Sequence, residues 1–126
     1  MDNNEFVEVV SAGMDALIEK QSQLEKMWNR YPARNSESTS VYIREVILSL
    51  MSEIQELLQE VHWKPWKSSR GLKNIDSYRE ELADVLHFTL DLYIAAGLTG
   101  KDAAQDYLDK WIKNTDRVSD TDYRES

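Results

Sequence analysis

Cysteine is absent from this chain, and glycine and proline are scarce, with 4 and 2 residues among 126. Without cysteine the protein has no disulfide framework and no thiolate metal site. So little glycine and proline leaves few of the turns that many short strands require, which favours long helices over a sheet. The length suits a single hydrophobic core, and we expect one domain over residues 1–126.

Long hydrophobic runs and a surplus of basic residues are also missing. No apolar run approaches the roughly 18 residues of a membrane span, and residues 1–5 are polar and acidic, unlike a signal peptide. The formal net charge of −8 argues against salt-driven binding to nucleic-acid polymers, which requires a basic surface. We therefore predict a soluble, cytoplasmic protein that binds no membrane and no nucleic-acid polymer.

Apolar residues recur at helical spacing, and this predicts an all-α bundle of four to five helices. The predicted helices cover about residues 4–30, 41–62, 77–97 and 99–115. Their ends are indicated by residues that cap a helix with a side-chain oxygen or leave it with a left-handed backbone. These residues are Ser38 or Ser40, Ser77 with Glu80 as a capping box, Gly97 as a stop, and Thr99 with Asp102. A mobile polar tail is expected from about residue 116.

The first half of the second helix, residues 41–51, is apolar on nearly all sides. A helix on the surface of a bundle needs only one apolar stripe. We therefore expect this helix to be central or to lie in a subunit interface, as in a homodimer or a tetramer.

Two pairs of acids lie three residues apart, Glu53 with Glu56 and Glu81 with Asp84. This spacing puts both members of a pair on one helix face, and each pair borders the apolar stripe of its helix. Two antiparallel helices that share this core bring four carboxylates together, where like charges cannot all ionise without cations. Such oxygen ligands suit Mg²⁺ or Mn²⁺, which activate water for attack on a triphosphate. One such pair alone indicates only solvated acids, whereas two matching pairs favour a metal site.

Di-iron chemistry is a second metal hypothesis, because di-iron bundles use Glu-x-x-His pairs from two helices. Only Asp84-x-x-His87 has this form, since Gln59 precedes His62 at the same spacing. The hypothesis is not favoured, and a lone histidine such as His87 is more often a hydrogen-bonded structural group than a ligand.

Between the acid pairs lies a segment that we call the basic aromatic loop, residues 63–76, which begins Trp63-Lys-Pro-Trp-Lys67. A tryptophan ring can stack on a nucleobase, and lysine can meet phosphate oxygens. The alternative is that both rings fold back and cover the end of the bundle. The neighbouring carboxylates favour the ligand-binding interpretation.

These features together resemble the all-α nucleoside triphosphate pyrophosphohydrolase superfamily, and within it the dimeric dUTPase family more than the MazG branch. The motifs that carry the resemblance are Glu53-x-x-Glu56, Glu81-Leu-Ala-Asp-Val-Leu-His-Phe88, Gln21-x-x-Leu24, Trp63-Lys-Pro-Trp-Lys67 and Lys110-x-x-x-Asn114-x-x-Arg117. The sequence departs from the family pattern at Pro65, where an aromatic residue is usual, and in lacking the Gly-Tyr that usually follows the arginine.

The resemblance implies Mg²⁺-dependent attack of water on dUTP to give dUMP and pyrophosphate, with two or more ions and with Mn²⁺ able to substitute. It implies that the metal ligands are Glu53, Glu56, Glu81 and Asp84, with Glu53 orienting the attacking water. The implied base-binding residues are Gln21, Trp63 and Trp66. The implied phosphate contacts, some of them across a dimer interface, are Lys64, Lys67, Lys110, Asn114 and Arg117.

Other functions remain open at this point. The same chemistry can act on dCTP or on a broad set of nucleotides, because base choice depends on a few hydrogen bonds. A helical protein without catalysis, which dimerises or senses nucleotides, carries similar helices but tolerates the loss of any one acid.

Overall fold

The computed structural model describes residues 1–28 and 36–120, with the side chains of 36–38 left aside. These residues form four helices and no β-strand: α1 (Asn3–Met27), α2 (Ser36–Gln59), α3 (Ile75–Ala95) and α4 (Gly100–Ser119). One isolated antiparallel bridge joins Val61 to Leu72 across the basic aromatic loop. The prediction of an all-α fold is confirmed.

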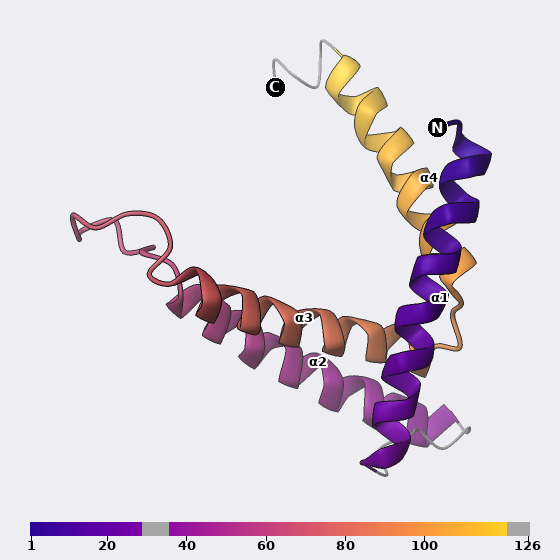
Figure 1. Ribbon diagram of the computed structural model, residues 1–126, viewed down its shortest axis with the longest axis horizontal. Helices are drawn as coiled ribbons and strands as arrows, with labels where there is room; N and C mark the ends of the chain where they lie inside the picture. Colours follow the sequence, from indigo (N-terminus) through magenta and orange to yellow (C-terminus); the bar gives the residue numbers. More distant parts are fainter. Residues whose placement is uncertain (29–35, 121–126) are drawn as a thin grey trace.

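The helices form two antiparallel pairs that meet at an angle (Figure 1). α2 and α3 lie side by side as one arm, and α1 and α4 pack together as the other. α1 also packs on α3, so that it meets the first arm at the end opposite the basic aromatic loop (Figure 1). No single helix in the described ranges is long and apolar enough to span a membrane. Taken together, α3 and α4 have the length and composition of a span, but the two helices are bent by 108° at the break between them.

The observed ends of α3 show why one predicted boundary is wrong. Its N-cap is Asn74, whose side-chain oxygen accepts hydrogen bonds from the backbone N–H groups of Asp76 at 2.8 Å and Ser77 at 3.2 Å. Ser77 is therefore already inside the helix, and the expected capping box with Glu80 does not form the start. The predicted stop is confirmed, because Gly97 has the left-handed φ of 70° that favours glycine.

The boundaries of α2 and α4 also differ in part from expectation. α2 begins at Ser36, so Ser38 and Ser40 lie within the helix and do not cap it. At α4 the predicted cap by Thr99 with Asp102 is confirmed, and it is a capping box, because the two side chains bond each other's backbone N–H groups. α4 continues to Ser119, beyond the predicted end, so the first part of the expected tail is helical. The rest of that tail, 121–126, lies outside the described residues.

α4 approaches α1 closely because the residues at the contact are small. Gly100, Ala103 and Ala104 are buried there. The Gly100 N–H donates to the Asp15 carboxylate at 2.7 Å. A Cβ on Gly100 would lie only 2.7 Å from the Asp15 backbone nitrogen and would also collide with the Ser11 carbonyl oxygen. This crossing therefore requires glycine.

Several large apolar side chains on the first arm are exposed in the part of the chain that the structure describes. Four apolar side chains of α2 are 43–59% exposed: Ile47, Leu48, Met51 and Ile54. Leu82 and Leu86 of α3 are similarly exposed, at 44% and 46%. A contiguous surface of this kind marks an interaction site more often than a solvated face.

Candidate functional site

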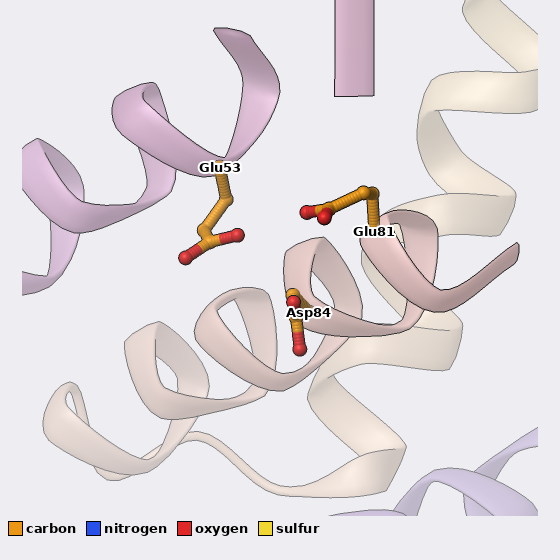
Figure 2. A group of neighbouring side chains, drawn as sticks. All are labelled: Glu53, Glu81 and Asp84. Carbon is orange, nitrogen blue, oxygen red and sulfur yellow. The ribbon is translucent and has the colours of Figure 1, made fainter. Parts of the chain in front are cut away.

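Three of the predicted metal ligands come together between α2 and α3. Glu53 projects from α2 toward Glu81 and Asp84 of α3 (Figure 2). Each of the three offers one carboxylate oxygen, and these atoms all lie within 4.8 Å of one another. The two acid pairs border the packed faces of antiparallel helices, which is why residues 28 positions or more apart in the sequence converge here.

The carboxylates of the cluster raise one another's pKa. Burial raises the pKa of Glu53 to about 7, helped by a hydrogen bond with Glu56 and by the charges of Glu56, Asp84 and Glu81. Burial also raises the pKa of Glu81, again with help from Glu56. Within the described residues, one oxygen each of Glu53 and Glu81 is buried without a hydrogen-bond partner. Unpartnered carboxylate oxygens close to further carboxylates fit a hard divalent cation.

Glu56, the fourth predicted ligand, lies beside this group. Its side chain is exposed, and it acts on both Glu53 and Glu81 by charge and hydrogen bonding. It is not among the three residues whose oxygens lie within 4.8 Å of one another. Its role as a metal ligand stays a prediction.

A buried polar network lies next to the carboxylates. Gln21, Glu25 and Asp91 are each only 3% exposed. The Gln21 side-chain NH₂ donates to Asp91 at 2.8 Å and, more weakly, to Glu25 at 3.4 Å. The Gln21 side-chain oxygen lies 2.5 Å from Nδ1 of His87. Tyr42 donates its hydroxyl to the second oxygen of Glu25 at 3.1 Å. The network therefore joins α1, α2 and α3.

A cavity of about 300 Å³ connects the network to the acidic cluster. Its polar lining comes from both groups, and its apolar lining includes two aromatic rings. The lining residues that matter here are Gln21, Glu25, Asp91 and His87 of the network, Glu53 and Asp84 of the cluster, and the aromatic residues Trp28 and Phe88. A second cavity of about 440 Å³, mostly apolar, is also lined by Gln21 and His87. Such a site, apolar with a few placed polar groups, is typical of small-molecule binding.

The basic aromatic loop forms a separate cavity in this chain. Trp63 and Trp66 contact edge to face with ring centroids 6.0 Å apart, and the Lys64 ammonium lies 6.0 Å from each ring. Trp66 is 69% exposed, so its ring does not cover the end of the bundle as one alternative required. Trp63, Lys64 and Lys67 line a cavity of about 250 Å³. The loop lies at the end of the first arm away from α1 (Figure 1), so one chain does not bring it to Gln21.

The remaining predicted phosphate contacts are on α4. Lys110, Asn114 and Arg117 are all exposed, and α4 belongs to the arm that leads away from α2 and α3 (Figure 1). A single chain therefore does not place them beside the acidic cluster. Their assignment to phosphate binding stays a prediction.

Two acids in the network, Glu25 and Asp91, were not among the predicted site residues. Glu25 follows Gln21 by four residues and so shares its helix face, which is a signal that the sequence contains. Asp91 lies on the same flank of its helix as Asp84, seven residues later. Neither spacing alone shows that the two carboxylates meet one amide, because that depends on how α1 crosses α3.

Comparison with known families gives a match over most of the chain. The family model described as dUTPase, that of the all-α dimeric dUTPases, matches residues 13–115. The matched span contains Gln21, both acid pairs and the basic aromatic loop, whereas Arg117 lies beyond it. No curated protein and no solved structure matches the chain.

Proposed function

The chain belongs to the all-α dUTPase family of nucleoside triphosphate pyrophosphohydrolases, and we propose that it hydrolyses dUTP to dUMP and pyrophosphate at the cluster of Glu53, Glu81 and Asp84. The observation that carries this placement is the convergence of three carboxylates whose buried oxygens lack protein partners among the described residues. The cavity beside them, lined by amide, imidazole and aromatic groups, provides a place for the nucleoside.

We infer that Glu53, Glu56, Glu81 and Asp84 hold two or more Mg²⁺ ions, for which Mn²⁺ can substitute. The donor set supports this, because clustered carboxylates are the ligands that these hard cations prefer. When bound, Mg²⁺ supplies charge neutralisation for the phosphates and lowers the pKa of bound water. The protein's contribution is to hold the carboxylates close together between α2 and α3, where burial raises the pKa of Glu53 and Glu81 and a bound cation would favour their ionised forms.

We assign to Glu53 the orientation of the attacking water. Without metal the pKa of Glu53 lies at about 7, and a bound cation would favour its ionised form, which can accept a hydrogen bond from water. Glu53 also lines the cavity, together with Asp84, and so lies beside the space in which substrate would lie. We therefore propose Glu53 as the catalytic residue.

We propose that a second copy of the chain completes the site. The exposed apolar side chains of α2 would be removed from water if they packed against another copy of the chain. Their exposure therefore supports a homodimer or a tetramer. The base-binding residues Gln21, Trp63 and Trp66 lie in two places within one chain, and the cations of the loop and of α4 are likewise apart from the carboxylates. A neighbouring copy would bring positive charge to the phosphates through Lys64, Lys67, Lys110 and Arg117, and a hydrogen-bond donor through Asn114.

The first experiment measures pyrophosphate release from dUTP and from the four standard deoxynucleoside triphosphates, with Mg²⁺ and with EDTA. Metal-dependent turnover of dUTP supports the proposal, and equal turnover of dCTP or of many nucleotides replaces it by a broader specificity. Glu53→Gln and Asp84→Asn should abolish turnover, whereas Glu45→Gln, an exposed charge change on the same helix as Glu53, should preserve it. Full turnover in both active-site variants contradicts the metal assignment, and no turnover in the wild type favours a binding protein.

A further inference from the structure

The buried amide of Gln21 has a fixed direction, and this direction follows from its partners. An ionised carboxylate can only accept hydrogen bonds. The Gln21 NH₂ must therefore face Asp91 at 2.8 Å and Glu25 at 3.4 Å. Its carbonyl oxygen then faces Nδ1 of His87 at 2.5 Å, so this nitrogen carries the proton. Both hydrogens of the amide are committed to the two acids.

Only an acceptor is left for a ligand. The carbonyl oxygen of Gln21 has two lone pairs, of which the ring N–H of His87 occupies one. Gln21 lines the cavity that also contains Glu53 and Asp84. A base held in this cavity, with its phosphates toward the acids, meets a carbonyl oxygen at Gln21 and no free N–H.

We propose that Asp91 and Glu25 are positioning residues that select the base by locking Gln21 as an acceptor. This inference rests on the proposed function, since it concerns the base of the same substrate. Uracil carries a hydrogen on ring nitrogen N3 and can donate to Gln21, whereas N3 of cytosine is a lone pair that faces the carbonyl oxygen unfavourably. Turning the amide over would reverse this preference. The network does not separate uracil from thymine, because both carry the N3 hydrogen.

A purely structural role for Asp91 makes a different prediction. Loss of packing or stability lowers the active fraction, and so it lowers turnover of every nucleotide by the same factor. Loss of the amide direction instead lowers kcat/KM for dUTP relative to dCTP. The ratio of the two kcat/KM values therefore separates positioning from support of the fold.

The test compares this ratio in the wild type, in Asp91→Asn, in Glu25→Gln and in the double variant. Asn and Gln at these positions can present either an oxygen or an NH₂ group, so Gln21 is no longer held in one direction. We expect the dUTP to dCTP ratio to fall about tenfold in the double variant, as for loss of one charge-assisted hydrogen bond. The single variant at Glu25 should show the smaller effect, because its contact is the longer one.

The matched control is Asp109→Asn. Asp109 accepts a hydrogen bond from the Gln105 side-chain NH₂ at 3.0 Å, the same kind of pair at the same four-residue spacing as Gln21 and Glu25, but exposed on α4. Its removal should leave the ratio unchanged. The Mg²⁺ concentration for half-maximal rate should also stay unchanged in the network variants, because the metal ligands are intact.

The inference is wrong if the double variant has the same ratio of kcat/KM for dUTP to kcat/KM for dCTP as the wild type. If the double variant does not fold, an unchanged ratio in both single variants is the contradicting result. A wild type that turns over dUTP and dCTP equally well also overturns it, while the proposed hydrolysis stands. A wild type that releases no pyrophosphate from dUTP overturns the proposed function first.

Discussion

Replacing Glu53 by glutamine should stabilise the metal-free protein, although it removes the proposed catalytic group. In the folded state burial and neighbouring charges raise the pKa of Glu53 from 4.5 to about 7. The folded protein therefore binds this proton more tightly than the unfolded chain. The resulting cost to stability is absent below pH 4.5, grows as the pH rises, and is complete above pH 7.

The size of the effect follows from the pKa change. At pH 8 a carboxyl with these two pKa values destabilises the fold by roughly 3 kcal/mol if nothing screens it. Glu53 is only half-buried, so solvent screening reduces this to about 1–2 kcal/mol. For a chain of this size that corresponds to a rise in Tm of about 3–10 °C in Glu53→Gln.

The assay is thermal unfolding of both proteins in EDTA at pH 8 and pH 5, at one protein concentration because association also affects Tm. The difference should be present at pH 8 and small at pH 5, where Glu53 is protonated in the folded wild type. Glu45→Gln, with the same charge change on an exposed site of α2, should shift Tm little at either pH. A metal-free Glu53→Gln protein that is no more stable than the wild type at pH 8 would refute the electrostatic account of the cluster.

Three further predictions concern the metal, the helix crossing and the apolar surface. The Mg²⁺ concentration for half-maximal pyrophosphate release should rise by at least about tenfold per pH unit below pH 7, because Glu53, as a proposed ligand, would have to lose its proton to bind metal, and a value independent of pH contradicts this. Gly100→Ala should lower the free energy of unfolding by about 1–3 kcal/mol in denaturant titrations, since its Cβ meets backbone atoms of α1. Its control, Gly13→Ala, has open space and should stabilise by about 0.5–1 kcal/mol, so equal effects of the two changes contradict the close crossing. Leu48→Asp should shift sedimentation toward a smaller species, whereas Val9→Asp, equally exposed on α1, should not; unchanged sedimentation of both argues against an interface on α2.

The sequence predicted the four helices, apart from some of their ends, and the meeting of three of the four acids, because both depend on short-range periodicity. A three-residue spacing places Glu53 and Glu56 on one face whatever the rest of the chain does, and antiparallel packing of two such helices brings Glu53 to Glu81 and Asp84. The start of α3 was missed for a local reason: Asn74 caps it from outside the apolar pattern. Such a cap depends on one side-chain conformation that periodicity does not report.

Contacts between α1 and the first arm were beyond sequence reasoning. The meeting of Glu25 with Tyr42, and of Gln21 with Asp91, joins residues 17 and 70 positions apart and depends on the angle at which α1 crosses the arm. Because α1 packs on α4 as well, α4 lies away from the carboxylates. The acid pairs, the basic aromatic loop and the cations of α4, which the sequence suggests form one site, therefore lie apart within one chain. A resemblance to a family names such residues, but it does not state which copy of the chain supplies them.

The acids of the network and of the cluster are of two kinds, which differ in their hydrogen bonding. Glu25 and Asp91 accept from Tyr42 and Gln21, so their charges are satisfied and hold neighbouring groups in fixed directions. Glu53 and Glu81 each keep a buried oxygen without a partner among the described residues. Satisfied acids rigidify the network around them, whereas unsatisfied ones raise the free energy of the metal-free fold and so favour binding of a cation. The two groups thus divide the cavity into a side that can read a base and a side that can hold metal and phosphate.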